Sequence, residues 1–167
     1  MKILIKISFV ILAFFILVIT DLCSVQAQEP KVLTGYVEMV PQSFFGTWRI
    51  VSKRIDTDNP AYFKEKSLDL WNLSKSFDVI TLSNPFNGAR AEIKLDRVET
   101  NYIVFTKKGK YDNKILTDTV EIMLDGDSFT GFNTIKLDTY SNGKIKKSDT
   151  AKYSLKGEKI AGDTISQ

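Results

Sequence analysis

The chain has 167 residues, no histidine and a single cysteine, Cys23, near its N-terminus. The usual general base and the commonest transition-metal ligand are therefore missing, and thiol chemistry is confined to one residue. The 23 basic and 20 acidic residues nearly balance, which gives little support to nucleic-acid binding. We expect a non-catalytic protein without a metal or cofactor.

The N-terminal segment has the pattern of a secretory signal peptide. Lys2 and Lys6 precede the apolar run 7–20, and Val25-Gln26-Ala27 places small residues before a cleavage site. The run is shorter than the roughly 20 residues of a membrane span. We expect cleavage after Ala27, which releases a single domain, 28–167, into the periplasm or medium. The alternatives are an uncleaved anchor and lipid attachment at Cys23, which the bulky Leu22 before it disfavours.

The next stretch leads into the first long strand. Residues 36–40 are expected to form a brief strand, which the Pro41-Gln42-Ser43 turn ends, and 48–55 to form the first long strand. In the connection 56–67, Asn59 and Pro60 match a helix N-cap and first position, so a short helix is predicted over 61–66. Long ordered connections are often functional, and we interpret this one as a lid.

The rest of the chain is a series of hairpins. Asp125-Gly126 and Asn142-Gly143 are strong hairpin signals, and Lys156-Gly157-Glu158 is interpreted as the last turn. The predicted strands after the first are 68–73, 77–83, 89–98, 102–107, 115–124, 129–140 and 145–155. The regular spacing predicts an all-β protein, an antiparallel up-and-down barrel of about eight strands.

The motif Gly46-x-Trp48, the turn before it, the long connection after the first strand and the hairpin series together resemble the lipocalin-like (calycin) barrels of bacterial type. The resemblance implies that a basic residue from the last strand packs over the tryptophan. No arginine follows Arg97, so Lys152 or Lys156 is expected in that role. It also implies a barrel that holds a ligand.

Aromatic side chains on the predicted strands are the candidate ligand-binding residues, because apolar linings with a few polar groups are typical of small-molecule sites. They are Trp71, Phe105, Phe129 and Tyr153, with Tyr62 and Phe63 from the long connection. The expected partner is a small apolar molecule or lipid, and contact with a membrane surface is left open.

Two alternatives stay open: a filled barrel that acts as a protein-interaction or inhibitor module, and an eight-stranded barrel that spans the outer membrane. Four acidic residues alternate with apolar neighbours and are expected on the outer, wet face: Asp118, Glu121, Asp138 and Asp149.

Overall fold

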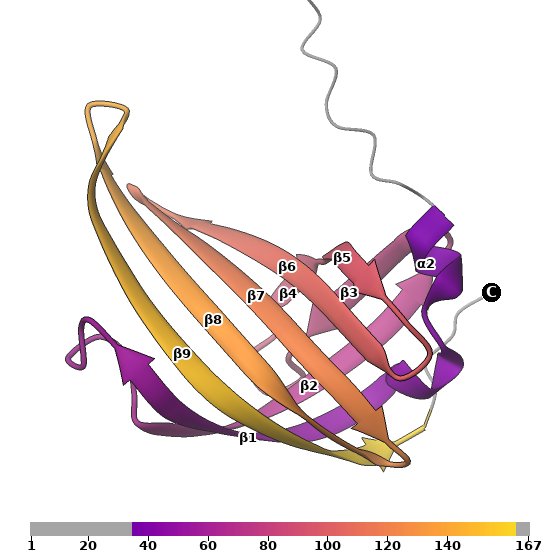
Figure 1. Ribbon diagram of the computed structural model, residues 1–167. Coiled ribbons are helices and arrows are strands. Elements are labelled where there is room, and N and C mark those ends of the chain that lie inside the picture. The colour runs from indigo at the N-terminus through magenta and orange to yellow at the C-terminus, as the bar shows by residue number, and fades with distance from the viewer. Residues whose placement is uncertain (1–34, 163–167) are drawn as a thin grey trace, which may run out of the picture. The chain divides into compact units, whose positions relative to one another are not determined.

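A computed structural model describes residues 35–162. The predicted signal peptide, its cleavage site and Cys23 lie outside these residues. The described residues form one nine-stranded antiparallel sheet that curls into a nearly closed barrel (Figure 1). The predicted all-β barrel is therefore confirmed.

The strands follow one another around the barrel in chain order, and the last strand, β9, pairs with the first, β1. This up-and-down order is the predicted one, because tight sequential turns join neighbouring strands. The strands are β1 (Gly46–Thr57), β2 (Lys66–Ser76), β3 (Val79–Ser83), β4 (Arg90–Glu92), β5 (Lys94–Val98), β6 (Tyr102–Tyr111), β7 (Lys114–Asp125), β8 (Ser128–Ser141) and β9 (Lys144–Ala161).

The predicted strand 89–98 is divided at Ile93 into β4 and β5, which explains why nine strands replace eight. Its first part pairs with β3 and its second part with β6. At the break, the Ile93 amide donates to the Ile80 carbonyl at 3.0 Å. One divided strand therefore bridges the two edges of the sheet.

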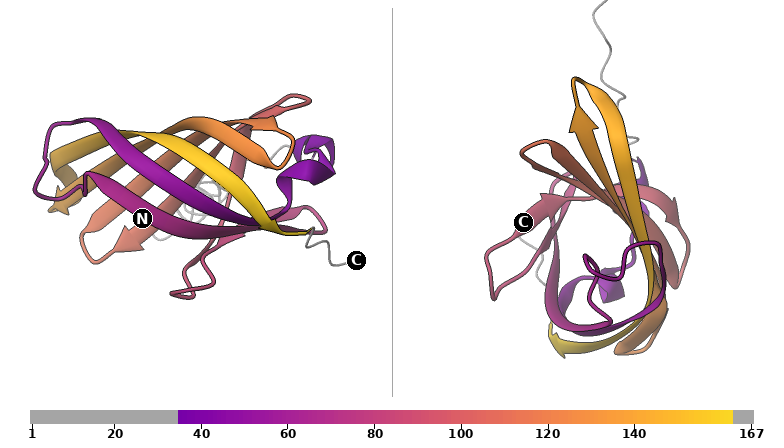
Figure 2. Two further views of the ribbon diagram at one scale, coloured as in Figure 1. Left: turned by 90° about the horizontal axis from the view of Figure 1, so that it is seen from below. Right: turned by 90° about the vertical axis from the view of Figure 1, so that its left-hand side faces the viewer.

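The alternating direction of the strands gives the barrel two ends. We call the end at which β1 begins the closed end, because large side chains fill it, and the other end the open end. The closed end carries helix α2 (Gly35–Met39), the 3-10 turn η2 (Gln42–Phe44) and the connections β2–β3, β5–β6 and β7–β8. At the open end lie the connections β1–β2, β3–β4, β6–β7 and β8–β9. Figure 2 (right) views the ring of strands from the open end.

Residues 36–40 were predicted to form a strand, but 35–39 form helix α2. Val37 and Val40 are three residues apart, so a helical turn places both on one face. Both are buried, with 5% and 6% of their surface exposed. The segment is helical because a helix buries this face against the barrel. The spacing of apolar residues alone did not predict that outcome.

Large apolar side chains fill the interior towards the closed end. Trp48 is 3% exposed, its indole N–H donates to the Phe44 carbonyl at 3.0 Å, and its ring centroid lies 5.1 Å from that of Phe129. The largest fully buried side chains are Phe44, Phe45, Phe105, Ile50, Ile80, Ile103, Leu155 and Val120. The Gly46-x-Trp48 motif therefore closes one end of the barrel.

The basic residue over this tryptophan is Lys159, rather than the expected Lys152 or Lys156. Its ammonium lies 5.3 Å from the Trp48 ring and donates to the Ser43 carbonyl at 3.0 Å. Successive side chains of a strand point to opposite faces, so Lys152 and Lys156 share the outward face and Lys159 shares the inward one.

The predicted turn at 156–158 is absent, because β9 continues to Ala161. A Cβ at Gly157 would lie 2.3–2.7 Å from three atoms of the Phe129 ring. The glycine therefore makes room for an aromatic ring inside the barrel, and the strand extends far enough to place Lys159 over Trp48.

Candidate functional site

A cavity of about 280 Å³ lies in the open-end half of the barrel interior, between strands β2–β4 on one side and β6–β7 on the other. Trp71, Leu82 and Leu116 supply apolar surface to its lining, and Asp69 and Asp118 supply carboxylates. Arg90, Lys107 and Lys108 add basic groups, so the lining is about as polar as it is apolar. The barrel interior is therefore filled towards the closed end and holds this cavity on the β2–β4 and β6–β7 side of the open end.

One wall of the cavity is fixed by Asp69. Its carboxylate accepts hydrogen bonds from the Trp71 indole N–H at 3.1 Å, from the Leu70 amide at 2.9 Å and from the Asn84 side-chain amide. These bonds hold the Trp71 ring in one orientation on the inward face of β2. A flat aromatic surface is therefore already in place for a ligand.

The opposite wall carries a buried ion pair. Lys107 of β6 and Asp118 of β7 are directly paired across the two strands, and the ammonium lies 2.8 Å from Oδ2 of Asp118. The aspartate side chain is only 7% exposed, and its Oδ1 has no hydrogen-bond partner. A buried oxygen without a partner costs free energy, so this wall offers an acceptor to a donor group.

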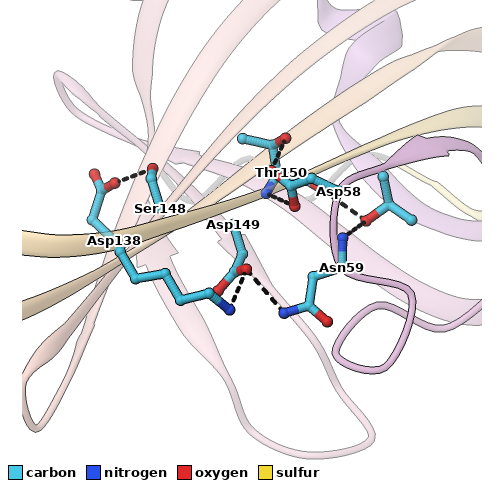
Figure 3. A network of polar contacts seen from close by, with 8 residues as sticks. Asp58, Asn59, Asp138, Ser148, Asp149 and Thr150 are labelled. Carbon is cyan, nitrogen blue, oxygen red and sulfur yellow. Dashed lines mark hydrogen bonds and ion pairs between the residues drawn. The ribbon is translucent and has the colours of Figure 1, made fainter.

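The 58–65 part of the β1–β2 connection is latched to β9 at the open end (Figure 3). The Asp58 carboxylate accepts from the Thr150 amide at 2.8 Å and from its hydroxyl at 2.9 Å. The Asn59 side-chain amide donates to Asp149 at 2.9 Å, and the Lys147 ammonium lies 2.7 Å from the same carboxylate. We call these five residues the latch.

The predicted helix over 61–66 does not form. Residues 59–62 make a hydrogen-bonded turn instead, in which the Tyr62 amide donates to the Asn59 carbonyl at 3.2 Å. The carbonyls that a helix would use are taken by the barrel. Arg54 donates to Phe63 and Pro60, and the Tyr153 hydroxyl donates to Lys64 at 3.0 Å. Tertiary contacts therefore override the local helix signal.

The acidic residues expected on a wet outer face are mostly buried. Asp118 and Asp149 point inward and Asp138 points outward, yet all three are 3–6% exposed. Hydrogen bonds from Ser148 and then Lys136 lower the pKa of Asp138. Only Glu121 is half-buried, and its carboxylate lies 3.3 Å from the Tyr102 hydroxyl.

The latch is expected to weaken in acid. Hydrogen bonds from Lys147 and then from Asn59 hold the pKa of Asp149 below its usual value of 3.8. A lowered folded-state pKa stabilises the protein above the unfolded-state value, and this contribution is lost as the pH falls through the folded-state pKa. We expect Asp149→Asn to lower the free energy of unfolding at pH 7, and the difference from wild type to shrink below pH 3.8.

Urea unfolding between pH 7 and pH 2.5 measures this difference. Asp112→Asn, which removes the same charge from an exposed hairpin turn, is the control and should change little. A deficit of Asp149→Asn that stays constant over the whole range would contradict the role of the carboxylate.

Of the six predicted ligand-binding residues, only Trp71 lines the cavity. Phe105 and Phe129 are 1% and 2% exposed and belong to the filled core. Tyr153 and Phe63 are buried where the β1–β2 connection meets the barrel, and Tyr62 is exposed on that connection.

Three charged residues of the cavity lining were not identified from the sequence: Asp69, Lys107 and Asp118. Asp118 lies two residues before Val120 and so shares the inward face of Val120 and Ile122. That alternation was visible in the sequence and was the signal for an inward carboxylate.

Comparison with family models, curated proteins and solved structures finds no match to this chain. Within residues 35–162, no group of three or more acidic or cysteine side chains is placed to hold a metal ion. None of the helices in the same part of the chain has the length and apolar character needed to cross a bilayer. The class that the described residues define is thus an antiparallel barrel with a partly polar internal cavity.

Proposed function

We propose that this chain is an exported, non-catalytic binding protein of lipocalin-like type that holds a small amphiphilic molecule in the open half of its barrel. The observation that carries the proposal is the cavity of about 280 Å³ with a fixed tryptophan on one wall and an unsatisfied carboxylate oxygen on the other. Its volume is near the lower limit of ligand pockets, which is about 300 Å³.

The lining supports one class of ligand. An apolar body packs on Trp71, Leu82 and Leu116, and a hydrogen-bond donor reaches Asp118. The charged groups of the lining are the carboxylates of Asp69 and Asp118 and the basic groups of Arg90, Lys107 and Lys108, so the lining sets two requirements: an apolar body, and a donor that reaches the unsatisfied Oδ1 of Asp118. A small aromatic or aliphatic amine satisfies both requirements. The filled closed end leaves no room for a long acyl chain along the barrel axis.

Phenethylamine is a suitable probe, with 2-phenylethanol and phenylacetate as neutral and anionic partners of similar size. We expect the amine to bind most tightly in isothermal titration calorimetry. Trp71→Ala should weaken it at least tenfold, which corresponds to about 1.4 kcal/mol. Asp118→Asn should abolish the preference for the amine over the alcohol.

Phe77→Ala is the matched control, because Phe77 is 85% exposed on the β2–β3 turn at the closed end. It should leave the affinity unchanged. Absence of binding by all three probes at millimolar concentration, together with a native mass spectrum of the purified protein without a retained small molecule, would refute the proposal.

A protein-interaction module is the second proposal, and the exposure of Phe77 is the observation that favours it. Val79, two residues later, is also 39% exposed. A partner that is lost with Phe77→Ala but retained with Trp71→Ala would favour this function over ligand binding in the cavity.

A further inference from the structure

Two neighbouring hairpins reach the open end, residues 107–118 of β6 and β7 and residues 136–149 of β8 and β9 (Figure 1). Positive charge is concentrated in them. Together these hairpins contain eight lysines and four aspartates. Three of the aspartates are matched by lysines of the same hairpins, in the pairs Lys107–Asp118, Lys136–Asp138 and Lys147–Asp149. The hairpins therefore carry an excess of four positive charges.

The closed end has the opposite character. Its three connections, 77–78, 99–101 and 126–127, contain no lysine or arginine and carry the carboxylates Asp78, Glu99 and Asp127, with Asp125 at the end of β7 beside them. Glu99 is paired with Arg97 of β5. The open-end hairpins are thus more positively charged than the connections at the closed end. An anionic surface attracts the open end and repels these connections, so the field orients the molecule before contact.

The β7–β8 ladder places the two hairpins side by side, and Tyr62 lies beside both of them. Its ring lies 5.4 Å from the ammonium of Lys114 on β7 and 5.2 Å from that of Lys147 on β9. The lysines of both hairpins form one surface, since β7 and β8 are directly paired. We call this surface the basic rim. It consists of Tyr62, Lys114 and the exposed residues around the two hairpin turns: Lys108, Lys110, Tyr111, Lys144, Ile145, Lys146 and Lys147.

Apolar side chains are interspersed with the lysines of the basic rim. Tyr111 and Ile145 lie next to the two turns and are 60% and 51% exposed, and Tyr62 is 59% exposed. Four exposed lysines beside them form no ion pair with any of residues 35–162: Lys108, Lys110, Lys144 and Lys146. Tyrosine and aliphatic side chains flanked by lysines are typical of segments that lie in the headgroup region of a bilayer.

We propose that the basic rim docks on the surface of a bilayer that contains anionic phospholipids. The lysines contact lipid phosphates, and Tyr111 and Ile145 enter the headgroup layer between them. This orientation turns the open end of the barrel towards the membrane. The inference rests on the charge and exposure of the rim and not on which molecule the cavity holds; Lys108 and Tyr111 belong to both the rim and the cavity lining.

Vesicle co-sedimentation tests the proposal. The full chain is expressed, and the protein is purified in the form that it has after any processing in the cell. Vesicles of phosphatidylglycerol and phosphatidylcholine at 3:7 are compared with phosphatidylcholine alone, at about 50 mM and 500 mM salt. We expect binding to the anionic vesicles only, and its loss at high salt, because the Debye length shortens from about 14 Å to about 4 Å.

Lys144→Glu/Lys146→Glu should weaken binding about 25-fold or more, since each lysine near such a surface contributes about fivefold. Lys75→Glu/Lys156→Glu is the matched control, with the same charge change on strand positions away from the rim, and should weaken binding less than threefold. All variants share the same N-terminal segment, so its contribution cancels.

Three outcomes would overturn the proposal: no binding to anionic vesicles at low salt, equal binding to uncharged vesicles, or equal losses in the two double variants. Binding to a soluble polyanion such as heparin without binding to vesicles would also overturn it, because the rim would then recognise a polymer.

Discussion

Replacing Trp48 by alanine is expected to lower the free energy of unfolding by about 3–5 kcal/mol. The side chain is 3% exposed and packs against Phe129, and its indole N–H satisfies the carbonyl of Phe44. The substitution leaves a cavity at the closed end and a carbonyl without its donor. It also removes the ring beneath the Lys159 ammonium. Urea unfolding followed by circular dichroism measures the loss.

Trp48→Phe separates packing from hydrogen bonding. It keeps most of the apolar volume and removes only the donor, so a smaller loss of about 1–2 kcal/mol is expected. If the alanine variant lost less than about 1 kcal/mol, the closed end would not be the main stabilising cluster of the barrel.

Gly131→Ala is expected to lower the free energy of unfolding by about 3 kcal/mol or more, which is at or above the upper end of the range for substitutions that overpack a core. Gly131 of β8 pairs with Ile122 of β7, and a Cβ built on it would lie 1.9 Å from the Glu121 carbonyl oxygen. The obstacle is the backbone of a neighbouring strand, which cannot rotate away as a side chain can. The two strands must separate locally, and the β7–β8 ladder weakens.

Gly162→Ala is the control, because no heavy atom lies within 4 Å of a Cβ built there. It should change the free energy of unfolding by less than about 0.5 kcal/mol. Equal stability of the two variants would show that β7 and β8 tolerate a side chain at position 131, contrary to the observed packing.

The hairpin turns could be predicted because their chemistry is local. Asn142 and Gly143 have φ angles of 51° and 74°, the pair of positive values that a two-residue hairpin requires and that these two residues tolerate. Regular alternation of apolar residues then fixed the strands between turns. Together these two signals were sufficient for the barrel and its up-and-down order.

The connections at the two ends could not be predicted in the same way. Residues 35–40 and 58–65 adopt conformations set by the barrel against which they pack. In the second segment, one arginine, Arg54, takes two backbone carbonyls from a helix that would otherwise be plausible. Local propensity has no access to such a partner, because it lies on another element.

The candidate site was only partly predictable. Trp71 was identified as a residue of an apolar lining, but the polar half of the cavity was not. The alternation with Val120 puts Asp118 on the inward face, but a carboxylate there needs a partner, and its partner, Lys107, lies on another strand. The ion pair makes burial of Asp118 tolerable, and pairing between strands is information that the order of residues does not contain.

The division of one strand at Ile93 has a consequence for how copies of this protein meet. β4 and β5 each pair on one side, so each leaves a free strand edge on the barrel wall. A free edge can recruit a strand of another chain and begin aggregation. Here both edges are short, and charged side chains recur along them: Arg90, Glu92, Lys94, Asp96 and Arg97. A second copy would have to bury these charges to add a strand, so the opening in the ring is protected against self-association.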